Sequence, residues 1–214
     1  MNNHYSLSLA AWIDSTYALG PGKRFAFWLQ GCPFSCPGCV APSFLPIMPA
    51  HQFTIEQLLS LIAPVEGCEG ITISGGEPML QAEPLAALLK MIHSQFDLSV
   101  IIYSGYYLNE LKRLAVHNPA ISQILGMVDV LIDGRYEHSQ NDSRGLRGSA
   151  NQTIHFFTKR YAHLRYLFVS QQRMPEIHPL PAGNKLMVGL PTLSQWRYTA
   201  LDSHGQKWYD DLIS

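Results

Sequence analysis

The sequence contains few charged residues and no segment in which charge of one sign accumulates. Of its 214 residues, 14% are charged, and 15 lysines and arginines almost balance 16 aspartates and glutamates. No run of like charges is available to follow a phosphate backbone or an anionic bilayer, so we expect no nucleic-acid partner. A hydrophobic content of 47% favours a compact, well-buried fold over a disordered chain.

Long hydrophobic runs are also missing. No stretch approaches the roughly 20 apolar residues that a membrane-spanning helix requires. The first residues, MNNHYSLSLAAWIDS, lack the basic region and apolar stretch of a secretory signal. The sequence therefore predicts a cytoplasmic protein that does not associate with a membrane.

Cysteine is scarce, yet three of the four cysteines lie within eight residues. Cys32, Cys36 and Cys39 form the spacing C-x3-C-x2-C, directly after an apolar segment at residues 24–30. An odd number of thiols cannot pair internally, and a reducing compartment disfavours disulfides. The cluster is therefore predicted to bind metal.

Two kinds of metal site fit three neighbouring thiols. Three thiolates can bind three irons of a cubane iron-sulfur cluster and leave the fourth iron open, whereas a ferredoxin closes its cluster with a fourth cysteine. A structural zinc site would need a fourth Cys or His ligand, and the nearest downstream candidates are His51 and the isolated Cys68. A non-catalytic iron-sulfur or zinc protein therefore stays an alternative.

Apolar segments alternate between strand and helix character along the chain. Strands are predicted at 24–30, 70–74, 98–103 and 127–132, and helices at 54–62, 83–96 and 107–116. This alternation predicts an α/β fold with a parallel sheet, which binds ligands at the carboxyl ends of its strands. Further along, we predict a loop over 133–150, a helix from Asn151 and a strand at 164–169.

Polar and glycine-rich segments follow each of the four predicted strands. They are GCPFSCPGC from residue 31, GGEP from residue 75, SGYY from residue 104 and DGRY from residue 133. Since the strands are expected to be parallel, all four segments should meet at one rim of the sheet. That rim is the predicted active site.

The cysteine spacing after the first strand, followed by GGEP after the second, resembles the radical S-adenosylmethionine (SAM) superfamily. The resemblance implies a 4Fe-4S cluster bound by Cys32, Cys36 and Cys39, with the amino and carboxylate groups of SAM on the open iron. It also implies reductive cleavage of SAM to a 5′-deoxyadenosyl radical that abstracts hydrogen from a substrate. The protein would then orient the cofactor and exclude water.

The same resemblance implies a set of cofactor-binding residues. Glycines at a strand end let the backbone approach a ligand, and backbone carbonyls or a carboxylate can accept from the methionyl ammonium. Where many members have an aromatic residue before the third cysteine, this chain has Gly38, so the adenine would pack on Phe34 or Tyr103. The implied set is Phe34, Gly75, Gly76, Glu77, Pro78, Ser104, Asp133 and Arg135, the last three on the cofactor or on an incoming glycyl loop.

Finer matches resemble the glycyl radical enzyme activases, in particular the activating proteins of anaerobic ribonucleotide reductase. They are GPGKR at 20–24, CPGC at 36–39, SGY at 104–106, DVLIDG at 129–134 and RGSANQ at 147–152. This resemblance implies a partial (β/α)6 TIM-like barrel with an open parallel sheet. It also implies a glycyl radical enzyme as partner and an external one-electron donor of the flavodoxin or ferredoxin type.

The chain departs from that family at its C-terminal end. The reductase activases generally end soon after the RGSxNQ segment, whereas this chain continues to residue 214. We therefore predict a radical SAM core at 1–170 and an extension at 171–214 that completes or covers the core, with Trp196, Trp208 and Tyr209 suited to an anchor or an interface. The extension favours a second hypothesis, a radical SAM enzyme that modifies a different peptide or a small molecule.

Overall fold

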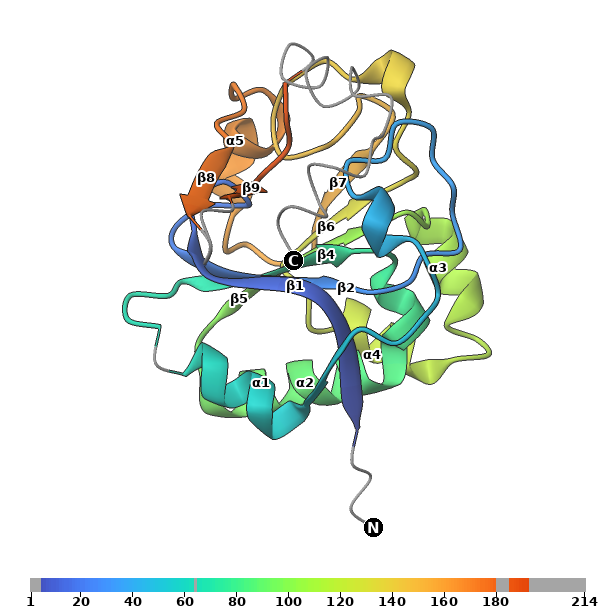
Figure 1. Cartoon of the computed structure of the whole chain (residues 1–214), viewed down its shortest axis with the longest axis vertical. Helices are drawn as coiled ribbons and strands as arrows, with labels where there is room; N and C mark the ends of the chain where they lie inside the picture. The colour runs from blue at the N-terminus through green and yellow to red at the C-terminus, as the bar shows by residue number, and fades with distance from the viewer. Residues whose placement is uncertain (1–4, 64, 180–184, 193–214) are drawn as a thin grey trace.

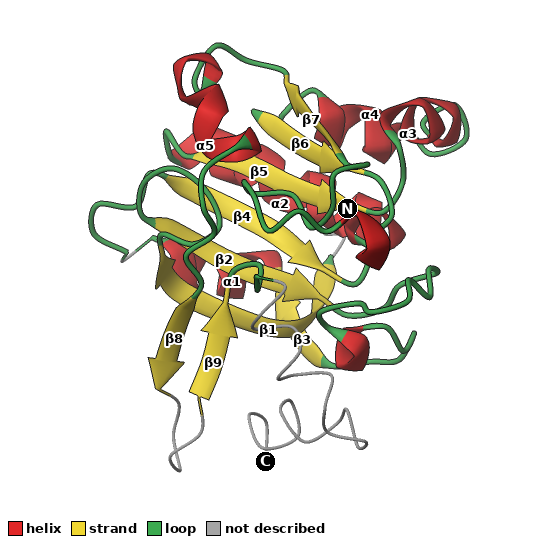
Figure 2. Cartoon of the chain, turned by 90° about the horizontal axis from the view of Figure 1, so that it is seen from above, coloured by secondary structure: helices red, strands yellow, loops and turns green. Residues whose placement is uncertain are grey.

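A seven-stranded mixed sheet forms the centre of the molecule (Figure 2). The computed structural model describes residues 5–63, 65–179 and 185–192. The strand order is β3-β1-β2-β4-β5-β6-β7. The strands are β1 (Ser6–Thr16), β2 (Arg24–Leu29), β3 (His51–Thr54), β4 (Gly70–Gly75), β5 (Ser99–Ser104), β6 (Val130–Asp133) and β7 (Thr153–Phe156).

The inner part of the sheet is parallel, as the sequence predicts. Strands β2, β4, β5 and β6 pair in parallel, while β1, β3 and β7 extend the two edges by antiparallel pairing. Both edges remain open among the described residues, because no pairing joins β3 to β7. The predicted fold class, an α/β partial barrel with an open sheet, is confirmed.

Helices between the parallel strands cover one face of the sheet. They are α1 (Ile55–Ile62), α2 (Ala82–Gln95), α3 (Leu108–Leu114) and α4 (Pro119–Leu125). In Figure 1, α1, α2 and α4 lie together below the sheet, on the side away from α5 (Arg165–Val169), β8 (Glu176–Pro179) and β9 (Lys185–Val188). The molecule is therefore layered, with the helices on one face and the loops and the start of the extension on the other.

Burial on both faces explains the composition of the parallel strands. The apolar residues of β4, β5 and β6 are fully buried, and the inward stripe of α2, which includes Leu85, Leu88 and Ile92, packs against them. The helix start predicted at residue 54 is confirmed, since Thr54 caps α1 by accepting from the Gln57 backbone N–H.

Two predicted elements are wrong. The segment 164–169 forms helix α5 rather than a strand, and the chain after Asn151 forms strand β7 rather than a helix. Short apolar runs do not distinguish the two states, and here tertiary contacts decide: Phe168 of α5 packs edge-on against Phe156 of β7. Strands β1 and β3 and helix α4 were not predicted.

A buried arginine holds together the amino ends of three parallel strands. Arg24 at the start of β2 donates hydrogen bonds to Thr72 of β4, to Ser99 of β5 and to the Tyr161 hydroxyl. Its side chain is fully buried, so the amino ends of these strands are filled by structural contacts. A ligand site is therefore expected at the opposite, carboxyl ends of the strands.

The described part of the extension packs on the core. Strands β8 and β9 form an antiparallel pair, and Val188 of β9 is buried against Leu19 and Ala26. Glu176 of β8 accepts from the Thr16 hydroxyl at 2.7 Å. The division at residue 170 stays a prediction, and Trp196, Trp208 and Tyr209 lie outside the described residues.

No helix within the described ranges has the length and apolar character needed to cross a membrane.

Candidate functional site

The cysteine loop begins at the carboxyl end of β2 and folds back on itself. The backbone N–H groups of Gly31 and Cys32 donate to the carbonyls of Phe44 and Leu45, both at 2.9 Å. Within the loop, the Cys39 N–H donates to the Cys36 carbonyl at 3.1 Å. These bonds fix the shape of the loop that carries the three thiols.

Gly38 has a structural reason to replace the aromatic residue that many radical SAM enzymes carry before the third cysteine. Its φ is +74°, a conformation that favours glycine, and an added Cβ would lie 3.3 Å from Nδ1 of His138. Any larger side chain here would meet both strain and a neighbour. An apolar surface for a ligand must therefore come from elsewhere in the site.

The GGEP segment is bonded directly to the start of the cysteine loop. The Gly76 N–H donates to the Leu29 carbonyl at 2.7 Å, and the Glu77 N–H donates to the Gly31 carbonyl at 2.8 Å. A Cβ on Gly76 would lie 2.0 Å from the Gly31 carbonyl oxygen, a distance that no structure tolerates. The glycine therefore lets one motif approach the other, which explains why the two occur together.

Glu77 is completely buried and joins the ends of β4 and β5. Its carboxylate accepts from the Ser104 hydroxyl at 2.9 Å, from the Gly105 N–H at 2.7 Å and from the Met79 N–H at 3.0 Å. Burial raises the pKa of Glu77 to about 7, against the opposing effect of these hydrogen bonds. The side chain thus braces the rim, and Pro78 after it begins the 3-10 turn Pro78–Gln81 that leads into α2.

One cavity of about 140 Å³ lies at this rim. Of the residues that the sequence predicts for the site, its lining contains Cys32, Phe34, Cys36, Cys39, Gly75, Gly76 and Ser104. Tyr103, predicted together with Phe34 as a surface for the adenine, lines it as well. Residues that the sequence does not assign to the site also line it, among them Gly105, Gly134, Tyr136, Asn141, Gly148, Gln152, Arg173, Leu190 and Pro191. Glu77, Pro78, Asp133 and Arg135 are not part of this lining.

The three thiols suit a cluster better than a single ion. All three cysteines are free and partly buried, and burial raises the pKa of Cys32 to about 11 and also raises that of Cys39. Within the described ranges, no three Cys, His, Asp or Glu side chains converge as ligands of one metal ion do. In a cubane cluster each thiolate binds its own iron, so three separated thiols around one cavity fit it.

Phe34 and Arg135 form a stacked pair beside the cavity. The Arg135 guanidinium lies 4.5 Å from the centre of the Phe34 ring and bonds Glu110 of α3 through two nitrogens, at 2.9 and 3.1 Å. The Phe34 ring also makes an edge-on contact with Tyr106. Phe34 thus presents a fixed apolar surface to the cavity, and Arg135 holds it from behind.

Asp133, at the end of β6, has hydrogen-bond partners on only one of its two carboxylate oxygens among the described residues. Its Oδ2 accepts from the Leu108 N–H at the start of α3, at 2.5 Å, and lies 3.0 Å from Nε2 of His155. Its Oδ1 is buried without a hydrogen-bond partner among the described residues. Direct contact of Asp133 or Arg135 with a cofactor stays a prediction.

The RGSANQ segment is fastened to the end of β6. Asn151 donates to the Arg135 carbonyl at 2.8 Å, and Gln152 donates to the Gly134 carbonyl at 2.7 Å. Gln152 also accepts from the Gly148 N–H at 2.6 Å. The sequence places this segment in the family pattern but does not predict Gln152 as a site residue, and no sequence motif indicates Arg173.

These features define an open-sheet α/β protein with a three-cysteine cluster loop at the carboxyl ends of its parallel strands. The pattern of the 4Fe-4S single cluster domain matches residues 18–155. The chain therefore belongs to this family, and as a radical SAM protein of the activase type it has a 4Fe-4S cluster and SAM as cofactors.

Individual relatives are more specific than the domain pattern. The chain is 34% identical to an anaerobic ribonucleoside-triphosphate reductase-activating protein of Vibrio cholerae, over 65% of this chain and 91% of the relative. It is 31% identical to the protein of that name in Salmonella typhi, over 64% and 90%. It is 27% identical to the pyruvate formate-lyase-activating enzyme of Staphylococcus epidermidis, over 68% and 59%.

Proposed function

We propose that this protein activates a glycyl radical enzyme of the anaerobic ribonucleoside-triphosphate reductase type by removing a hydrogen atom from a glycine of that partner. The observation that carries the proposal is the lining of one cavity by three free cysteines and by the two glycines of GGEP. The relatives named above support the choice of partner. When bound, the cluster and SAM supply the radical chemistry.

Different residues of the cavity have different roles in binding the cluster and SAM. Cys32, Cys36 and Cys39 would hold the cluster. The backbone at Gly75 and Gly76 and the hydroxyl of Ser104 provide polar contacts for the methionyl part of SAM, and Phe34 provides the apolar surface for the adenine. Glu77 holds Ser104 in place and Arg135 holds Phe34, while Glu77, Pro78, Asp133 and Arg135 themselves stay predicted cofactor-binding residues outside the cavity lining.

The reaction also needs components that the chain does not contain. An external one-electron donor of the flavodoxin or ferredoxin type would reduce the cluster. The hydrogen atom taken from the glycine would end on 5′-deoxyadenosine, and the partner would keep the glycyl radical. We place the protein in the reducing cytoplasm, with no membrane or nucleic-acid partner.

The experiment starts from protein prepared and reconstituted without oxygen. The reduced enzyme with SAM should release 5′-deoxyadenosine, and a co-incubated reductase should acquire a glycyl radical signal in electron paramagnetic resonance. Cys36→Ala should lose both the cluster and the activity, while Cys68→Ala should retain them. Zinc in place of iron and sulfide, with no SAM binding, would overturn the proposal in favour of a non-catalytic metal protein.

A second candidate is a radical SAM enzyme that modifies a different peptide or a small molecule. The observation in its favour is that Arg173, Leu190 and Pro191, which lie beyond the family match, line the same cavity. Release of 5′-deoxyadenosine together with persistent failure to form a glycyl radical on the reductase would favour this candidate.

A further inference from the structure

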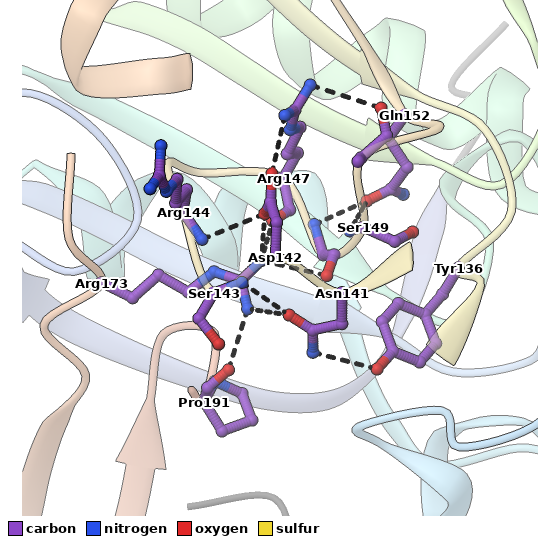
Figure 3. Close-up of polar contacts among 12 residues, drawn as sticks. Tyr136, Asn141, Asp142, Ser143, Arg144, Arg147, Ser149, Gln152, Arg173 and Pro191 are labelled. Carbon is purple, nitrogen blue, oxygen red and sulfur yellow. Dashed lines mark hydrogen bonds and ion pairs between the residues drawn. The ribbon is translucent and has the colours of Figure 1, made fainter. Parts of the chain in front are cut away.

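Arg173 enters the site from the extension and bonds to a segment of the core. It is 7% exposed, and four oxygens accept from its two terminal nitrogens. Nη1 donates to Oδ1 of Asn141 at 2.8 Å and to the Pro191 carbonyl at 2.9 Å (Figure 3). Nη2 donates to the carbonyls of Arg147 at 2.5 Å and Gly148 at 3.0 Å.

The four acceptors are neutral, so the geometry of the guanidinium accounts for these four hydrogen bonds. The nearest carboxylate, that of Asp142, lies 3.8 Å from Arg173 and 2.8 Å from Arg147, which is its closer partner. A planar guanidinium presents its donors in a fixed fork, and a lysine ammonium at the same place could not reach the four oxygens together. The position is therefore specific for arginine.

The bonded segment is also a wall of the cluster cavity. Asn141, Gly148, Arg173 and Pro191 all line that cavity. Asn141 continues the network by donating to the Tyr136 hydroxyl at 3.1 Å, and Tyr136 lines the cavity as well. One guanidinium thus joins the segment 141–148, the end of the extension's hairpin and the cavity.

We propose that Arg173 is a positioning residue through which the extension fixes the segment 141–148 as one wall of the cluster cavity. This fixed wall selects the polypeptide loop that reaches the cluster. The inference rests on the proposed function for the identity of that loop, but the fixation of the wall is independent of it. Without Arg173, the carbonyls of Arg147, Gly148 and Pro191 lose this donor, Asn141 Oδ1 keeps only the Ser143 N–H, and the wall loosens.

The direct test is amide hydrogen exchange of the holoprotein over peptides that cover 141–149. Arg173→Ala should accelerate exchange there at least tenfold, and Arg173→Lys should fall between Arg173→Ala and the unmodified protein. The matched control is Arg144→Ala in the same segment. The Arg144 side chain is exposed, and the hydrogen bond to Asp142 comes from the Arg144 backbone N–H, which alanine keeps. This variant should exchange like the unmodified protein. Iron and sulfide content should be equal in all of them.

A kinetic measurement tests the selection of the loop. With the partner enzyme as variable substrate, Arg173→Ala should raise KM at least fivefold and change kcat less than twofold, because a loose wall weakens docking more than chemistry. Arg173→Lys should recover part of this loss. An unchanged KM would overturn the selective role even if exchange accelerates.

Other outcomes separate this inference from the proposed function. If Arg173→Ala does not fold, Asn141→Ala removes one acceptor with less disturbance and should still accelerate exchange at 141–149. Unchanged exchange in a folded Arg173→Ala protein would overturn the inference. If the unmodified protein forms no glycyl radical on the reductase, the proposed function fails, while the exchange result still decides whether Arg173 fixes the wall.

Discussion

At the scale of single residues, Gly76 decides whether the two motifs of the site can meet. Its absent Cβ leaves room for the Gly31 carbonyl, and Gly76→Ala would place a methyl group 2.0 Å from that oxygen. We expect a loss of about 2–4 kcal/mol in the free energy of unfolding and a large decrease in bound iron after reconstitution.

Chemical denaturation and iron analysis measure these two effects. The control is Gly126→Ala at the end of α4, where an added Cβ would have 3.4 Å to its nearest neighbour and the backbone is right-handed. It should stay within about 0.5 kcal/mol of the unmodified protein. Equal iron content in Gly76→Ala would contradict the close approach of the two motifs.

Glu77 should give the protein without its cluster a pH-dependent stability. Because burial raises the pKa of Glu77 from 4.5 to about 7, the folded state holds this proton more tightly than the unfolded state. The contribution is therefore fully present below about pH 4.5 and is lost as pH rises to about 7, with a total on the order of 3 kcal/mol. Urea unfolding between pH 5 and pH 8 measures this slope.

Two variants interpret the slope. Glu77→Gln cannot ionise, so it should remove most of the decrease between pH 5 and pH 7, even though its amide places a donor among donors and lowers stability at every pH. Glu83→Gln, on the exposed side of α2, should keep the slope of the unmodified protein. A slope that is the same with and without Glu77 would show that this carboxyl is ionised throughout.

At the scale of elements, Asp133 joins the end of β6 to the start of α3 and to β7. Asp133→Ala leaves the Leu108 N–H without its acceptor and removes the contact with His155. We expect a loss of about 1–3 kcal/mol in the free energy of unfolding, together with a change of less than threefold in the Kd for SAM. Calorimetric unfolding and SAM titration of the holoprotein measure the two quantities.

The control is Asp97→Ala, since Asp97 is 94% exposed and pairs with Arg160 at the surface. It should change stability by less than about 1 kcal/mol. A large loss of SAM affinity in Asp133→Ala, with little loss of stability, would instead support the direct cofactor contact that the sequence predicts for this residue.

The sequence predicts best those elements whose burial leaves a local pattern. The strands β2, β4, β5 and β6 are rich in buried apolar residues because both of their faces are covered, and α1 begins at a recognisable cap. The predictions of a helix from Asn151 and of a strand at 164–169 are wrong because the packing of Phe156 on Phe168 determines both conformations. Such packing depends on residues far apart in the chain.

The same distinction applies to the site. Cys32, Cys36 and Cys39 lie in one loop, and the glycines of GGEP follow one strand, so spacing alone indicates a common rim. The side chains of Tyr136, Asn141 and Arg173 reach the cavity only through the folding of a long loop and the return of the extension. Contacts between segments far apart in the chain leave no local pattern in the sequence, so the sequence does not predict these residues as part of the site.

At the scale of the whole molecule, the described part of the extension is continuous with the core. Val188 is fully buried with Leu19 and Ala26, the Thr16 hydroxyl donates to Glu176, and Arg173 bonds to the segment 141–148. Contacts at three separate places should make the extension unfold together with the core. The predicted boundary at residue 170, which lies beyond the end of the family match at residue 155, would then not separate two independent folding units.

Val188→Ala tests this continuity, because it removes two methyl groups from a contact that joins the two parts. We expect the free energy of unfolding to fall by about 1–3 kcal/mol, with core and extension still unfolding in one transition when followed by hydrogen exchange of β5 and of β9. Ile177→Ala in the paired strand β8 is the matched control, since Ile177 is 69% exposed and its loss should cost less than about 0.5 kcal/mol. If Val188→Ala instead released β9 at low denaturant while β5 kept its protection, the extension would be a separately folding unit. Its contribution to the cluster cavity would then form and be lost independently of the sheet that carries the cysteines.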